Sequence, residues 1–193
     1  EIGFTPKWYR ASLGVEFGEH WHRDPAYRAA GLARMREELA RRFPGYGIGG
    51  GLADDILTGT YGACVVAAMF GLPILYAPDQ WPTCAGPYLD DDAVDRIEPI
   101  DPSSNAFINA LLVQCDAIAM QEGCVKGFIN WQGILNNAHR LRGEALFLDL
   151  MLAPERCSRL FEAVYQTMVA AMRALHHRQR GYGVDVRFAT VSN

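Results

Sequence analysis

The sequence predicts an α/β fold in which the strands of a parallel sheet alternate with helices. Half of the 193 residues are apolar, enough to bury a sizeable core. Three short apolar runs read as strands and are separated by helical stretches, at 73–77, 125–131 and 184–191. This alternation is typical of βα units. A complete eight-fold (β/α)8 barrel of the TIM type needs about 250 residues, so a barrel here would be about half present.

The chain is expected to form a single domain over residues 1–193. It begins at Glu1 without an initiator Met and stops on a predicted strand. We therefore expect the N-terminal part of a larger barrel, with extra helices before its first strand.

The net charge and the lengths of the apolar runs argue against nucleic acids and membranes as partners. A net charge of −4 gives no basic surface for nucleic acid or for an anionic membrane. No apolar run approaches the roughly 20 residues of a membrane span. The cysteines are scattered without a CxxC pair, which favours a reducing, cytoplasmic setting and mostly buried, inert thiols: Cys64, Cys84, Cys115, Cys124 and Cys157.

The first predicted helix begins with Asp24 as its N-cap and Pro25 at its first position, and it ends before Pro44-Gly45. The glycine-rich stretch 45–51 follows a helix rather than a strand. It is therefore interpreted as a flexible turn near a site, with a phosphate-binding loop as the alternative.

The middle of the chain is predicted to hold a short helix at 61–70, a buried strand at 73–77 and a turn-rich acidic stretch at 78–102. The three aspartates at 90–92 lack the spacing of a calcium loop and are interpreted as the start of a small helix over 92–97.

The second half is predicted to be mainly helical. Ser103 or Ser104 is expected to cap a helix that Gly123 ends. A strand at 125–131, a helical region at 132–152 and a long helix from Pro154 to Arg180 follow, before the last strand.

Residues at the ends of predicted strands are the main site candidates, because barrel enzymes place their chemistry there. Asp79 and Trp81 follow the first strand, Asn130 and Trp131 the second, and Asn193 the third. Asp79 is a candidate catalytic carboxylate, and the others are candidates for binding a substrate or cofactor. Ordinary loop structure is the alternative.

Two further clusters are candidates. His20 and His22 flank a tryptophan and could both face a site from an extended segment, or lie in a partly exposed loop. Asp55, next to Asp54, is a candidate general acid or base, with helix capping as the alternative. The sequence does not identify a metal-ligand set.

Several runs of the sequence resemble, in order, the uroporphyrinogen decarboxylase superfamily. They are DDIL at 54–57, FGLPI at 70–74, IEPIDP at 97–102, GFINW at 127–131, LRGEALFLDL at 141–150 and APE at 153–155. The resemblance covers residues 8–193 with gaps, and it implies a βα barrel with its site at the C-terminal ends of the strands.

The resemblance implies one of two chemistries. Decarboxylases of the superfamily act on porphyrinogens without a cofactor, and Asp55 matches the aspartate of their D-I-L motif. Their N-terminal R-Q-A-G-R motif is matched here only by Arg10 and Gly14, so the second arginine is missing. This departure favours the other branch.

That branch comprises corrinoid-dependent methyltransferases, which move a methyl group between a corrinoid and an acceptor. The resemblance implies a corrinoid, a zinc ion whose ligands would lie beyond residue 193, and a corrinoid protein as partner. The alternatives are a porphyrinogen decarboxylase, or a non-catalytic tetrapyrrole-binding half-barrel that closes its sheet as a homodimer or with a C-terminal half.

Overall fold

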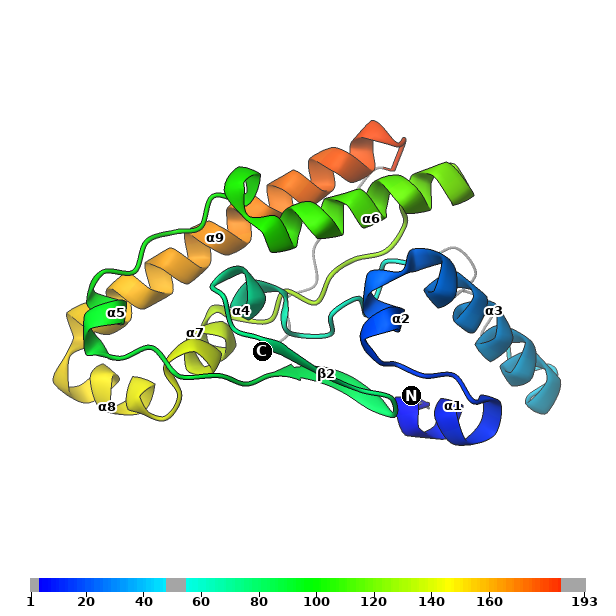
Figure 1. Ribbon diagram of the computed structural model, residues 1–193, viewed down its shortest axis with the longest axis horizontal. Helices are drawn as coiled ribbons and strands as arrows, with labels where there is room; N and C mark the ends of the chain where they lie inside the picture. Colours follow the sequence, from blue (N-terminus) through cyan, green and yellow to red (C-terminus); the bar gives the residue numbers. More distant parts are fainter. Residues whose placement is uncertain (1–3, 48–54, 185–193) are drawn as a thin grey trace.

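Helices dominate the computed structural model, which describes residues 4–47 and 55–184 (Figure 1). The elements follow one another as α1 (Pro6–Leu13), α2 (Glu19–Arg23), α3 (Pro25–Arg42), α4 (Val65–Met69), β1 (Ile74–Ala77), β2 (Gln80–Cys84), α5 (Asp91–Asp95), a 3-10 turn (Pro102–Ser104), α6 (Ala106–Glu122), α7 (Ile134–Arg142), α8 (Ala145–Leu152) and α9 (Pro154–Gly181).

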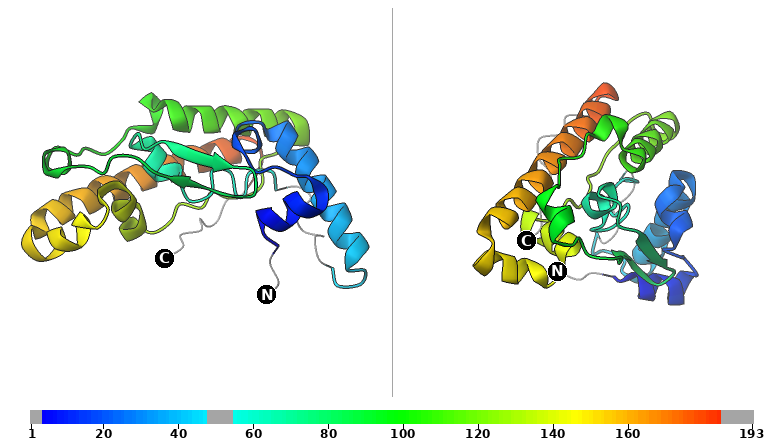
Figure 2. Two further views of the ribbon diagram at one scale, coloured as in Figure 1. Left: turned by 60° about the horizontal axis from the view of Figure 1, so that its bottom comes forward. Right: turned by 60° about the vertical axis from the view of Figure 1, so that its left-hand side comes forward.

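The elements form an elongated arrangement. Helices α1 to α3 lie at one end, while α5, α8 and the start of α9 lie at the other (Figures 1 and 2). The long helices α6 and α9 run side by side along one edge, and the β1–β2 hairpin lies between the two ends. Within the described ranges, no helix combines the length and the apolar character that a membrane crossing needs.

The predicted helix boundaries that rest on capping residues are confirmed. Asp24 accepts hydrogen bonds from the backbone N–H groups of Ala26 and Tyr27 at 2.9 and 3.1 Å, and Pro25 opens α3. Gly123 ends α6 in the left-handed conformation, at φ 78°. Such a conformation costs glycine little, which explains why the helix stops there.

The N-cap of α6 differs from the prediction. Asn105, not Ser103 or Ser104, accepts the hydrogen bond from the backbone N–H of Ile108, at 3.1 Å. The two serines lie in the preceding 3-10 turn, which Asp101 caps. The serines that were expected to start the helix therefore belong to a separate turn with its own cap.

The described strands form one antiparallel hairpin and not part of a parallel sheet. The predicted strand at 73–77 is confirmed as β1, but it is not buried, since Leu75 is 52% exposed. The next strand, β2, has five residues and was expected to be loop. Ile74 pairs with Cys84 and Leu75 with Thr83. Trp81 and Thr83 have high strand propensity, and this outweighs the turn signal of the neighbouring prolines.

The segment 125–131 is extended and half-buried, but it is not a strand in the described structure, so that prediction is wrong as stated. Its backbone groups are bonded by side chains rather than by a neighbouring strand. The Gln179 side chain donates to the carbonyls of Val125 and Gly127, at 3.0 and 2.9 Å. The N–H of Phe128 donates to the hydroxyl of Thr58, at 3.2 Å.

The strand predicted at 184–191 falls almost entirely outside the described residues, as do Asp54 and most of the glycine-rich stretch. What the structure shows is an α/β-type fold that is mostly helical, with two antiparallel strands.

A buried arginine holds the N-terminal helices to the rest of the core. Arg28 of α3 is fully buried and donates to the carbonyls of Ile56 and Trp21, at 2.6 and 2.7 Å, and to the Gln114 side chain at 3.2 Å. Gln114 in turn donates to the Tyr61 hydroxyl at 2.9 Å. Burial lowers the pKa of Arg28 to about 10, so the guanidinium is still charged at neutral pH.

A second polar cluster holds the opposite end together. Arg142 of α7 is buried and bonds Asp149 of α8 at 2.7 Å and Asp91 of α5 at 2.5 Å. Arg156 of α9 binds Asp95 through two hydrogen bonds of 3.0 Å. Ion pairs therefore join the four helices α5, α7, α8 and α9. A guanidinium that forms two hydrogen bonds with a carboxylate binds it more strongly than a single ion pair does.

We predict that Arg28→Met destabilises the protein by about 3 kcal/mol or more, because it leaves two buried carbonyls and Gln114 without their charged donor. Urea unfolding followed by circular dichroism measures this. Arg173→Met, on an exposed position of α9, is the control and should change stability by no more than about 0.5 kcal/mol. Equal midpoints for the two variants would contradict the role given to Arg28.

Candidate functional site

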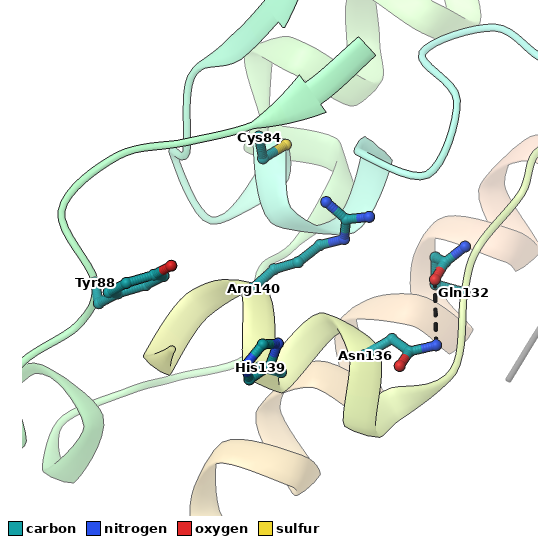
Figure 3. A pocket seen from close by; sticks show the side chains of 6 residues that line it. All are labelled: Cys84, Tyr88, Gln132, Asn136, His139 and Arg140. Carbon is teal, nitrogen blue, oxygen red and sulfur yellow. Dashed lines mark hydrogen bonds between the residues drawn. The ribbon is translucent and has the colours of Figure 1, made fainter. Parts of the chain in front are cut away.

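A pocket of about 390 Å³ lies between the end of the hairpin and α7 (Figure 3). This volume is in the range of small-molecule sites. Its walls come from β2, from the loop that follows β2, from the end of the extended segment and from α7. The lining residues are Cys84, Tyr88, Gln132, Asn136, His139 and Arg140.

Arg140 is the only cation without a counter-charge among the residues that line this pocket. Its side chain extends from α7 toward Cys84 (Figure 3). Within residues 4–47 and 55–184, Arg140 takes part in no hydrogen bond or ion pair, whereas the neighbouring Arg142 is fully engaged. A half-buried guanidinium that has no partner within these ranges can donate its N–H groups to an anionic ligand.

Amide side chains form the wall opposite Cys84. Asn136 donates to the Gln132 side chain at 3.2 Å, and Gln132 bonds back to Asn130, its backbone N–H donating to the Asn130 side chain at 3.1 Å (Figure 3). Gln132 has φ 60°, a left-handed conformation that is costly for a non-glycine residue. The bonds to Asn130 hold this strained turn and aim both amides at the pocket.

His139 stands in the last turn of α7, where a cation is favoured by the helix dipole. Its Nε2 lies 3.2 Å from a carboxylate oxygen of Glu144, and its ring lies 5.3 Å from that of Phe147. These contacts fix the imidazole at the pocket wall.

Cys84 provides a thiol that differs from the other cysteines. The side-chain interaction with Cys64 and the positive charge of Arg140 lower the pKa of Cys84 below its ordinary value. Burial instead raises the pKa of Cys115, to about 12. The expectation of buried, inert thiols therefore holds for Cys115, which is fully buried, but not for Cys84, which lines the pocket.

Asp55 lies beside the extended segment and not in the pocket lining. Its carboxylate accepts hydrogen bonds from the backbone N–H of Thr58, at 2.9 Å, and from the Thr58 hydroxyl. It also packs so closely on Gly127, at φ 102°, that a side chain there would collide with it. Asp55 therefore caps a turn rather than the helix that was the alternative, and a catalytic role for Asp55 stays a prediction.

Asp79 and Trp81, unlike Cys84 at the other end of β2, do not line the pocket. Asp79 occupies the hairpin turn, and Trp81 is 47% exposed on the face of β2 that packs on Gly59. The Trp81 ring makes an edge contact with Phe17, with centroids 5.5 Å apart. Neither residue lines the pocket, and their functional roles stay predictions.

The two histidines do not face one site. They lie on the short helix α2, where residues two apart point in nearly opposite directions. His20 is exposed, 3.0 Å from Asp24 and stacked on Tyr27. His22 is fully buried, and its Nδ1 accepts the backbone N–H of Tyr61 at 2.9 Å. Its Nε2 has no hydrogen-bond partner among the described residues.

Asn130 and Trp131, which were predicted at a strand end, lie next to the pocket but do not line it. Asn130 orients Gln132, while Trp131 is buried and its carbonyl accepts from the Asn137 side chain at 2.8 Å. Asn193 lies outside the described residues. Gln132, the residue directly after the predicted strand end at Trp131, does line the pocket. The predicted strand end was therefore one residue away from a pocket residue.

Sequence reasoning missed Arg140, Asn136, Tyr88 and Cys84. For Arg140 and Asn136 a signal exists, because both fall at i, i+4 on one face of α7, immediately after a predicted strand end. For Cys84 and Tyr88 no such signal exists, since they follow a strand that was not predicted.

Comparison with known proteins adds no assignment: no family model matches the chain, and no match was found among curated proteins or solved structures. Among the described residues, no group of His, Cys, Asp and Glu side chains could hold a metal ion.

We predict that His22 makes stability depend on pH. Burial, and secondarily the charge of Arg28, lower the pKa of His22 from 6.5 to about 4. As pH falls below 6.5, His22 becomes protonated in the unfolded chain but stays neutral in the folded chain. Folding stability is therefore lost between about pH 6.5 and pH 4. At pH 5 the loss is about 2 kcal/mol relative to pH 7.5.

Urea unfolding at the two pH values measures this. His22→Gln, whose amide oxygen can still accept the N–H of Tyr61, should lack that part of the pH dependence. His20→Gln, on the exposed side of the same helix, should retain it. A wild-type pH dependence in His22→Gln would show that other groups cause the loss.

Proposed function

We propose that this protein is a uroporphyrinogen decarboxylase-like enzyme of the corrinoid-dependent methyltransferase type, and that the pocket beside α7 binds its small anionic substrate. We further propose that segment 125–131, which is extended but pairs with no strand among the described residues, lies at the place of a strand in a (β/α)8 barrel. In support of this, Val125, Ile129 and Trp131 are buried along an extended backbone that runs beside Asp55–Thr58.

The observation that carries the proposal is the unpaired Arg140 in a pocket at the end of that segment. Strand ends are where barrel enzymes bind their substrates. The motif order and the missing second arginine near Arg10 favour the methyltransferase branch. A methyl acceptor or donor with a carboxylate, sulfonate or phosphate group would satisfy Arg140.

The lining residues suit defined tasks in such a reaction. Arg140 would hold the anionic group through charge-assisted hydrogen bonds. The Gln132 and Asn136 amides would orient polar groups of the substrate, and His139 could donate or accept a proton. These residues together fix one end of a small molecule and leave its other end free to react.

The proposed cofactors are a corrinoid and zinc, and the described side chains fit neither directly. A cavity of about 390 Å³ is too small to enclose a corrin ring, and no described cluster suits zinc. A corrinoid bound to a partner protein would have to approach from outside the pocket.

Of the alternatives, porphyrinogen decarboxylation is less well supported. A porphyrinogen carries several carboxylates, each costly to bury without a partner, and the pocket lining offers one guanidinium and one imidazole. The other alternative, a non-catalytic module that oligomerises, is favoured by α8, whose outer side exposes Phe147, Leu148, Met151 and Leu152.

The test is methyl transfer from methylcobalamin to anionic thiols, followed by the absorbance change as the cobalt loses its methyl group. We predict that Arg140→Gln raises KM for an anionic acceptor about tenfold, since a hydrogen bond to a charged group contributes about 1.5–3 kcal/mol. A neutral acceptor should be affected much less.

Arg173→Gln is the matched control and should behave as wild type. Decarboxylation of a porphyrinogen without any methyl transfer would overturn the methyltransferase assignment. A dimer in solution that lacks both activities but binds a tetrapyrrole would favour the non-catalytic module.

A further inference from the structure

Strand β2 lies unusually close to the backbone of the segment that precedes α4. The Trp81 ring sits 3.2 Å from the place that a Cβ on Gly59 would take, and Pro82 sits 3.3 Å from the corresponding place on Gly62. Both glycines have positive φ, at 81° and 51°. The absence of side chains at these two positions allows the strand and the segment to approach each other.

The same approach brings two cysteines together. The Cys64 thiol donates to the carbonyl of Pro82 at 3.4 Å, and the Cys84 thiol lies 3.8 Å from the carbonyl oxygen of Cys64. The Cys64 thiol thus contacts the backbone two residues before Cys84, and the Cys84 thiol contacts the backbone of Cys64 itself. A disulfide requires Cα atoms about 4.4–6.8 Å apart, a spacing within reach of residues in such contact.

The two thiols differ in access and in acidity. Cys84 is half-buried and lines the pocket, whereas Cys64 is fully buried. The side-chain interaction with Cys64, followed by the charge of Arg140, lowers the pKa of Cys84. That same interaction and burial raise the pKa of Cys64. An accessible thiol of lowered pKa beside a buried thiol is the arrangement of peroxide-sensing cysteine pairs.

We propose that Cys84 and Cys64 form an oxidation-sensitive pair, in which a peroxide attacks Cys84 and Cys64 resolves the product to a disulfide. The Cys84 thiolate attacks one peroxide oxygen, the O–O bond breaks, and hydroxide leaves, giving a sulfenic acid. The sulfur of Cys64 then attacks the sulfur of that sulfenic acid, loses its proton and releases water. Two thiols are oxidised and one peroxide is reduced.

The disulfide would change the pocket directly. It would take the Cys84 sulfur away from Arg140 and tie β2 to the turn before α4. The oxidation depends only on the two thiols and Arg140, so it can be tested whatever reaction the pocket performs.

The test treats the reduced protein with one equivalent of hydrogen peroxide, blocks free thiols with N-ethylmaleimide and maps the peptides by mass spectrometry. Residues 43–95 contain no Lys or Arg, so trypsin leaves both cysteines in one peptide. Chymotrypsin, which cleaves after Phe70 and Tyr76, separates them. We expect a cross-linked pair of peptides containing Cys64 and Cys84, lighter by two hydrogen atoms than the reduced pair.

Three variants test the roles of the two cysteines and of Arg140. In Cys64→Ser the sulfenic acid cannot be resolved, so dimedone should label Cys84. In Cys124→Ser, which removes another half-buried cysteine outside the pocket, the cross-link should form as in wild type. Arg140→Gln should slow the alkylation of Cys84 by iodoacetamide several-fold, a measurement on folded protein that does not require the Cys64 variant.

Labelling of Cys124 in preference to Cys84, or peroxide treatment that leaves both Cys64 and Cys84 free, would overturn the proposal. Alkylation of Cys84 no faster than that of Cys124 would do the same. Circular dichroism of each variant establishes that it is folded before its thiols are compared.

Discussion

The burial of Arg28 is the constraint on which the other arrangements depend. A guanidinium out of water must keep its hydrogen bonds, and two backbone carbonyls and one amide supply them here. The bond to the Ile56 carbonyl fixes the start of the segment 56–64, and the bond to Gln114 fixes that segment to α6 through Tyr61. One side chain of α3 thereby sets the position of a loop that no regular strand or helix holds.

Both walls of the pocket are positioned by contacts with the segment 56–64. On one side, Gly59 and Gly62 let β2 pack onto it, which places Cys84. On the other side, Thr58 bonds Phe128, and the chain from there leads to Gln132 and α7. The position of Arg140 opposite Cys84 therefore follows from contacts to a single short segment, and not from the long helices that make up most of the core.

Local signals predicted the long helices well, because a cap acts within a few residues. Asp24 and Gly123 bond or turn the backbone next to them, so their effect could be inferred from the sequence alone. The segment 125–131 shows the opposite case. Its apolar residues match a strand, yet its hydrogen bonds come from Thr58 and Gln179, distant residues that no local pattern reveals. The candidate site was predicted only in part for the same reason.

Helix α8 shows how a polar network can override a hydrophobic pattern. Seven of its eight residues, ALFLDLML, are apolar, which by itself predicts a helix buried on all sides. Instead its one acid, Asp149, points inward to Arg142 and Arg156, because a half-satisfied buried arginine costs more than exposed apolar surface. The opposite face of the helix must then turn Phe147 and Met151 outward, where they are 47% and 81% exposed. The orientation of α8 is thus set by the charges of its neighbours, and its own sequence specifies only that it is helical.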